Sequence, residues 1–146
     1  IIKHMPGHGL SKVDSHNFTP NVGKSFNYLK KNDFAAFRNK KSLFAMTAHI
    51  VFSKIDPKNT VTHSKKMISL IRSEIKFKNV LISDDLSMKS LKKSIKENTI
   101  KTFESGCNLA LHCNGNLSEM VTVAENSPLI NRFIIKKTSQ FYKILS

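Results

Sequence analysis

The sequence predicts an α/β fold built on a mostly parallel sheet, and three observations lead to that prediction. Short apolar segments of strand length alternate with stretches whose apolar residues recur every three or four positions, a pattern typical of βα units. Histidine, aspartate and lysine residues gather where the apolar segments end, and parallel α/β folds bind ligands at those ends. A chain of 146 residues, 40% of them hydrophobic, suits one domain with a packed core.

Four apolar segments are expected to form the strands. Each is short and is bounded by polar or glycine-containing sequence, as buried strands usually are. The segments cover residues 1–4, 42–52, 79–83 and 107–113. We therefore expect about four parallel strands with helices between them.

Three stretches show helical periodicity. Met67, Ile68 and Ile71 share one face of the first helix. A looser apolar stripe runs over residues 86–103 and stops before Gly106, which suits a helix C-cap. Apolar residues between 129 and 145 predict a closing amphipathic helix, whereas residues 14–39 are irregular and predict a long loop with one short helix.

The net charge of +14 raises the question of nucleic-acid binding. Only three of the 24 basic residues are arginines (Arg38, Arg72 and Arg132), although arginine supplies most bidentate readout of bases and phosphates. We therefore expect the lysines to cover solvated helix faces and expect no specific nucleic-acid partner.

The cysteine content indicates a reducing compartment. Two cysteines, Cys107 and Cys113, make no disulfide framework, so a reducing environment is the simpler interpretation. No apolar run approaches the roughly 20 residues of a membrane span, and no secretory signal opens the sequence. We expect no membrane association.

The first group of candidate functional residues follows the first strand. Residues 3–9 read Lys-His-Met-Pro-Gly-His-Gly, and Asp14-Ser15-His16 follow shortly after. A carboxylate two residues from a histidine can hold the imidazole in one tautomer and stabilise its protonated form, as a general acid/base requires. Two alternatives stay open: a loop histidine that is merely hydrogen-bonded, or a metal site with ligands from His4, His8, Asp14 and His16.

The second group follows the third strand. Asp84 and Asp85 come directly after an apolar run, so one carboxylate could face a site as a nucleophile while the other caps the next helix. His49 ends the second apolar segment and suits either a structural role or a hydrogen bond to a sugar. We interpret His112 and Cys113, at the fourth strand, as structural.

Taken together, these stretches resemble the bacterial β-N-acetylglucosaminidases of glycoside hydrolase family 3. The resemblance rests on residues 3–9, 14–16, 46–49, 56–57 and 82–88. It implies that Asp84 is the catalytic nucleophile, that His16 is the general acid/base and that Asp14 tunes it. It also implies that Lys3 and His4 bind sugar hydroxyls. The sequence departs from the family pattern at Ala36, at residues 60–64 and at Asn114, none of which belongs to the catalytic pair.

The resemblance further implies a retaining, two-step hydrolysis of terminal N-acetylglucosamine in cytoplasmic peptidoglycan recycling, without a cofactor or metal. The family's catalytic domain is a TIM-type (β/α)8 barrel of about 250 residues. Residues 1–146 are therefore expected to form the C-terminal half of such a barrel, marginally stable alone, with a complementary N-terminal half as partner. The alternative is a catalytically inactive fragment of such an enzyme.

Overall fold

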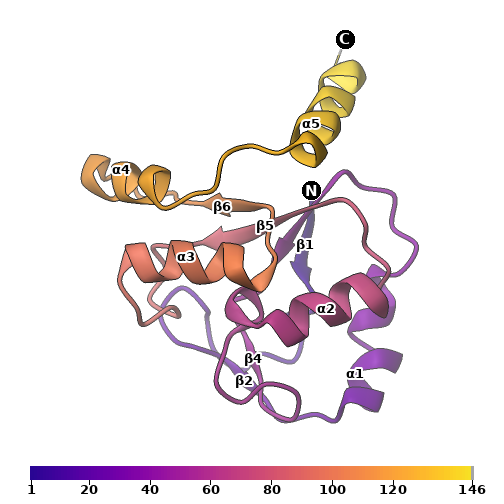
Figure 1. The fold of residues 1–146 in the computed structure, drawn as a ribbon. Coiled ribbons are helices and arrows are strands. Elements are labelled where there is room, and N and C mark those ends of the chain that lie inside the picture. Colours follow the sequence, from indigo (N-terminus) through magenta and orange to yellow (C-terminus); the bar gives the residue numbers. More distant parts are fainter. Residues whose placement is uncertain (146) are drawn as a thin grey trace.

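The computed structural model describes residues 1–145 and contains a four-stranded, fully parallel sheet (Figure 1). Its strands follow the order β1-β3-β5-β6. They are β1 (Ile2–Met5), β3 (Phe44–Thr47), β5 (Val80–Asp85) and β6 (Leu109–Leu111). The expected sheet of about four parallel strands is confirmed. Over the described residues β1 and β6 are open edges, so these strands do not close a barrel.

The second apolar segment is not one strand, as its sequence suggested. It contributes β3 to the main sheet and β4 (Val51–Phe52) to a separate parallel pair with β2 (Asn21–Val22). Between β3 and β4, Ala48, His49 and Ile50 are fully buried. The run is apolar throughout because the chain changes direction inside the protein, and hydrophobicity alone does not reveal that turn.

The irregular region holds more structure than predicted. Besides β2 it contains the short helix α1 (Phe26–Lys31) and the 3-10 turn η1 (Phe34–Phe37). Leu29 and Phe34 from these two elements are fully buried. The region is therefore part of the core and not only a loop.

Two helices cover the sheet as their periodicity predicted. A 3-10 turn, η2 (Val61–His63), leads into α2 (Lys65–Ser73), whose first turn is capped by the Ser64 hydroxyl. The next helix, α3 (Ile95–Ser105), begins with a Ser94–Glu97 capping box and ends at Gly106 with φ +106°. The predicted helical stripe was wrong at its start, because residues 86–94 form a loop.

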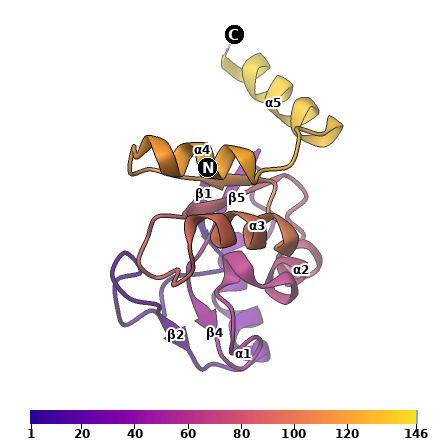
Figure 2. The ribbon, with the colours of Figure 1, turned by 60° about the vertical axis from the view of Figure 1, so that its left-hand side comes forward.

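Two helices complete the chain. α4 (Leu117–Glu125) was not predicted, and α5 (Arg132–Leu145) is the expected closing helix, although it begins after Leu129. α4 packs beside α3, and α5 lies at the opposite end of the molecule from α1 (Figure 2). Only Ile134 is buried in these two helices, and Leu129 is 95% exposed. None of the helices in residues 1–145 is long and apolar enough to cross a membrane.

Candidate active site

The ends of β1 and β5 bring His4 and Asp84 together across the end of β3. His4 Nε2 lies 3.5 Å from Asp84 Oδ2, and their side chains are 28% and 14% exposed. The pKa of His4 is lowered by burial, which outweighs the opposing attraction of Asp84. A neutral imidazole therefore faces a partly buried carboxylate at the carboxyl edge of the sheet.

Asp84 and Asp85 have different surroundings. Asp85 accepts hydrogen bonds from the Ser87 backbone N–H at 3.0 Å, the Ser87 hydroxyl at 2.6 Å and the Cys113 N–H at 3.1 Å. Burial alone would raise the pKa of Asp85, but these hydrogen bonds together lower it. Asp85 thus links the loop after β5 to the loop after β6. It does not cap the next helix, as one of the two aspartates was expected to do, because Ser94 caps α3. Asp84 accepts one bond, from the Asp85 N–H, through Oδ1, which leaves Oδ2 facing His4.

The predicted His16–Asp14 pair is formed. His16 Nδ1 lies 2.8 Å from Asp14 Oδ1, which also accepts the His16 backbone N–H at 2.9 Å. The hydrogen bond that His16 donates to Asp14 raises the pKa of His16, with smaller contributions from the charges of Asp84 and Asp85. The side chains of His16 and Asp14 are 75% and 60% exposed, so the imidazole is open to a ligand.

Backbone contacts dock the His16 loop against the loop that follows β5. The Lys89 N–H donates to the His16 carbonyl at 3.2 Å, and the Thr19 hydroxyl donates to the Ser90 carbonyl at 2.7 Å. These contacts explain how an irregular loop holds His16 near the β5 end. The residue spacing does not predict these two hydrogen bonds, because three of the four donor and acceptor groups belong to the backbone.

Gly7 allows the turn after β1 to pack closely. Its φ is +148°, and a Cβ built there would lie 2.7 Å from the Asp33 Cβ. Only glycine fits this combination of backbone conformation and close approach. The turn is thereby fixed against Asp33, a residue that the sequence alone did not connect with the site.

His49 lies directly beneath these aspartates and is fully buried. Its Nε2 lies 2.9 Å from the Asp85 carbonyl and its Nδ1 2.7 Å from the Thr62 hydroxyl. A carbonyl can only accept, so Nε2 donates; burial lowers the pKa of His49, so Nδ1 accepts from Thr62 in turn. Because both nitrogens are occupied by protein groups, the geometry favours the structural alternative over a sugar contact.

Other predicted residues are placed as follows. Lys3 is exposed on the edge strand β1 beside His4. His8 Nε2 lies 3.2 Å from the Ser15 hydroxyl. Across the part of the chain that the structure describes, no three His, Cys, Asp or Glu side chains group closely enough to hold a metal ion, so the metal alternative gains no ligand cluster.

One cluster at the same edge was missed. The His112 Nε2, after β6, lies 2.7 Å from the Glu119 Oε2, which also accepts from the Asn114 amide at 2.7 Å. The hydrogen bond from His112 lowers the pKa of Glu119. The cluster ties the β6 end to α4. A histidine followed seven residues later by a glutamate was its only signal, and it depends on the unpredicted helix α4.

Comparison with known proteins gives a consistent result. Residues 1–139 match the Glycosyl hydrolase family 3 N terminal domain. A β-hexosaminidase of Neisseria gonorrhoeae is 35% identical over 141 residues, which cover 90% of this chain and 39% of that protein. A β-hexosaminidase of Nitrosomonas eutropha is 32% identical over 117 residues, covering 77% and 34%.

Solved structures agree with the fold. Native NagZ from Neisseria gonorrhoeae matches with a TM-score of 0.79 and 31% identity, over 92% of this chain and 40% of that one. NagZ in complex with N-trifluoroacetyl-D-glucosamine matches with the same TM-score and 30% identity, over 94% and 40%. The chain thus spans about 39% of the curated relative it matches over 90% of its own length. It belongs to glycoside hydrolase family 3, the family of the bacterial β-hexosaminidases.

Proposed function

We propose that this chain supplies the nucleophile and the general acid/base of a retaining exo-β-N-acetylglucosaminidase. One observation supports this most strongly: a partly buried Asp84 carboxylate and a protonatable His16–Asp14 pair lie on the side of the sheet where the parallel strands have their carboxyl ends. The Oδ2 of Asp84 faces His4 at 3.5 Å and accepts no hydrogen bond from the described residues, whereas both carboxylate oxygens of Asp85 accept hydrogen bonds. This difference supports Asp84 as the nucleophile.

The proposed reaction has two steps. Asp84 attacks the anomeric carbon while His16 gives its proton to the departing glycosidic oxygen, which leaves a covalent glycosyl ester on Asp84. Neutral His16 then takes a proton from water, the water attacks the same carbon, and Asp84 is released. The raised pKa of His16 supports its role in the first step, because the acid must hold its proton near neutral pH.

The proposed substrate is a small carbohydrate with terminal N-acetylglucosamine, such as a muropeptide in cytoplasmic peptidoglycan recycling. The N-trifluoroacetyl-D-glucosamine complex of the Neisseria relative supports a sugar ligand. Lys3 and His4 would bind its hydroxyls, and His49 would hold the Asp84–Asp85 backbone in place. The proposed chemistry uses only side chains of the protein, without a metal or cofactor.

The proposed active unit contains more than residues 1–146. The chain spans 39% of its matched relative, and we propose that a complementary N-terminal half-barrel supplies the remaining sugar contacts. The exposed apolar residues of α4 and α5 are consistent with such a partner surface.

The test is release of 4-nitrophenol from 4-nitrophenyl N-acetyl-β-D-glucosaminide. The chain is assayed alone and mixed with the portion of the gonococcal β-hexosaminidase that it does not match. We expect turnover in the mixture, and a loss of about 10³-fold or more in Asp84→Ala because covalent catalysis is removed. Asp84→Ala turning over as fast as the unchanged chain would contradict the assignment. A mixture that binds the sugar without turnover would favour the inactive-fragment alternative.

A further inference from the structure

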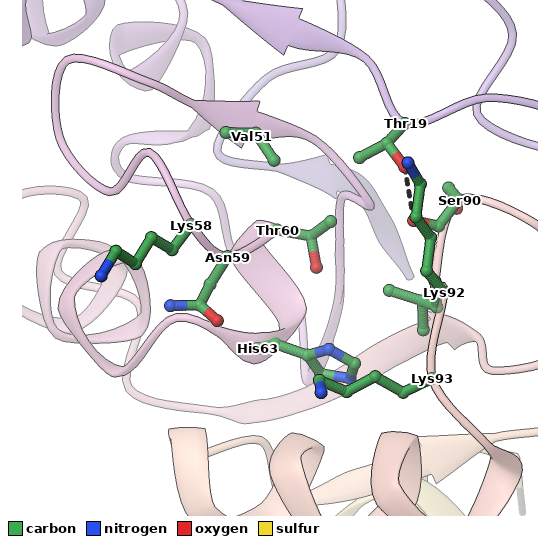
Figure 3. A pocket seen from close by; sticks show the side chains of 10 residues that line it. Thr19, Val51, Lys58, Asn59, Thr60, His63, Ser90, Lys92 and Lys93 are labelled. Atoms are coloured by element: carbon green, nitrogen blue, oxygen red, sulfur yellow. Dashed lines mark hydrogen bonds between the residues drawn. The ribbon is translucent and has the colours of Figure 1, made fainter.

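A recess separate from the candidate active site lies between the turn before η2 and the loop after β5 (Figure 3). Its volume is about 270 Å³. The walls that matter below are formed by Thr19, Thr60, His63, Ser90, Lys92 and Lys93. None of the described residues that line it is acidic.

Two hydroxyl groups in the wall have no partner. Thr60 and Ser90 are 6% and 2% exposed, and neither hydroxyl forms a hydrogen bond with any of residues 1–145. In Figure 3 the Thr60 hydroxyl points into the space that Asn59 and His63 border. A buried hydroxyl without a partner costs about 1–3 kcal/mol. The oxygens of Thr60 and Ser90 have less than 1 Å² of exposed surface, so each side chain must rotate toward the recess before it can donate to a polar ligand there.

The charge of the recess is positive. Lys92 has no carboxylate partner among the described residues, and the Lys93 ammonium lies 3.7 Å from Glu97. Asp56, which precedes the lining residues Lys58 and Asn59, is engaged by Asn59 and Ser64. His63 adds no charge, because burial lowers its pKa to about 4. Lysine ammonium groups with neutral hydroxyl donors match the chemistry of a phosphate oxyanion.

We propose that this recess binds a phosphate group, with Lys92 and Lys93 as charge partners and the Thr60 and Ser90 hydroxyls as donors. The group is either inorganic phosphate or the phosphate of a small ester. The Thr19–Ser90 hydrogen bond lies in the same wall and helps to dock the His16 loop. A ligand in the recess therefore touches the loop that carries His16.

The main experiment is calorimetric titration of the chain with inorganic phosphate at constant ionic strength. We expect saturable binding of one phosphate, weakened at least tenfold in the Lys92→Gln/Lys93→Gln double variant. The matched control is Lys40→Gln/Lys41→Gln, which removes the same charge at exposed positions outside the recess. The control is expected to bind within twofold of the unchanged chain. Equal losses in both double variants would overturn the proposal, because net charge alone would then hold the anion.

A second pair of variants tests the hydroxyls. Ser90→Ala and Thr60→Val should each weaken phosphate binding several-fold, whereas Thr60→Ser keeps the donor and should keep the affinity. Circular dichroism melts without phosphate identify any variant that fails to fold. Unchanged affinity in both hydroxyl-deleting variants would contradict the proposed donors.

Glucose 6-phosphate and glucose separate the two sources of the phosphate. Tighter binding of the ester assigns the recess to phosphate monoesters, and tighter binding of phosphate assigns it to the free ion. Glucose itself is expected not to bind. Failure of both phosphate and its ester to bind saturably would overturn the site.

Discussion

The first three quarters of the chain and the last quarter are packed very differently. In the described structure, every buried apolar residue but one lies in residues 1–107, and the exception is Ile134. Helix α3 buries four residues, whereas α4, of similar length, buries none. β6 is only half-buried along its length. Both regions contain amphipathic helices. They therefore differ in packing: the helices of the first region bury side chains against the rest of the protein, whereas α4 and α5 bury almost none.

This difference in packing bears on the stability of the candidate active site. His4 and Asp84 lie at strand ends that the core of the packed region fixes, and His16 lies on a loop docked against the loop after β5. Helices as short as α4 gain most of their stability from tertiary packing, and in this chain α4 and α5 have little. Their exposed apolar residues include Leu117, Met120, Ile135, Ile144 and Leu145, and a patch of this kind commonly marks an interaction surface.

Matched leucine truncations should show the largest contrast. Leu81 is fully buried in β5 and Leu129 is 95% exposed. We expect Leu81→Ala to lower the free energy of unfolding by about 2–5 kcal/mol through the cavity it leaves. Leu129→Ala should change it by less than about 0.5 kcal/mol. Urea denaturation measures both, and similar losses would remove the distinction between the regions.

Two glycines with positive φ give a second contrast. A Cβ at Gly106 would lie 3.1 Å from the Ile68 Cγ2 in the packed region, whereas a Cβ at Gly115 would meet nothing within 4 Å. Both Ala variants pay about 1 kcal/mol of backbone strain. We expect Gly106→Ala to cost a further ~1 kcal/mol, because Ile68 must shift. Equal unfolding midpoints for the two variants would show that Ile68 yields freely.

Acid should destabilise the packed region through its buried histidines. The pKa of His63 is about 4 in the folded chain, because burial disfavours its charge, against about 6.5 when unfolded. The unfolded state thus binds more protons between these values, so stability falls as pH drops through that window. We expect a loss of about 1 kcal/mol from pH 7.5 to 5.5 that His63→Gln reduces. An unchanged pH dependence in that variant would assign the loss to other groups.

The smallest expected effect concerns His16. The hydrogen bond that His16 donates to Asp14 raises the pKa of His16, so Asp14→Asn should lower the midpoint of His16 in an NMR titration. The unfolding midpoint should not change, because both side chains are exposed. Ser11→Ala, which removes a polar side-chain group elsewhere in the same loop, serves as the control. The same His16 midpoint in Asp14→Asn and the unchanged chain would mean that the pair does not persist in solution.

The sequence predicted the parallel sheet and the residues at its edge well. Strand ends can be predicted from apolar runs, and this places His4 and Asp84 at strand ends. The Asp14–His16 pair was predicted from the two-residue spacing between its members. The break between β3 and β4 could not be predicted from hydrophobicity, because residues 48–50, where the chain turns, are themselves fully buried. The start of α3 was also missed, because Leu86 and Leu91 are buried in a loop instead of on a helix face. The different surroundings of Asp84 and Asp85 could not be predicted, because one group that binds Asp85, the Cys113 N–H, lies 28 residues away in the sequence.

Trapping the glycosyl-enzyme tests the proposal that Asp84 is the nucleophile. The chain, mixed with the complementary portion of its relative, is incubated with an N-acetylglucosaminyl fluoride whose added ring fluorine slows release of the intermediate. Mass spectrometry of the digested protein then locates the sugar. We expect one sugar on the Asp84 carboxylate, retained in Asp85→Asn and absent in Asp84→Ala. A sugar on Asp85 or on another side chain would contradict it.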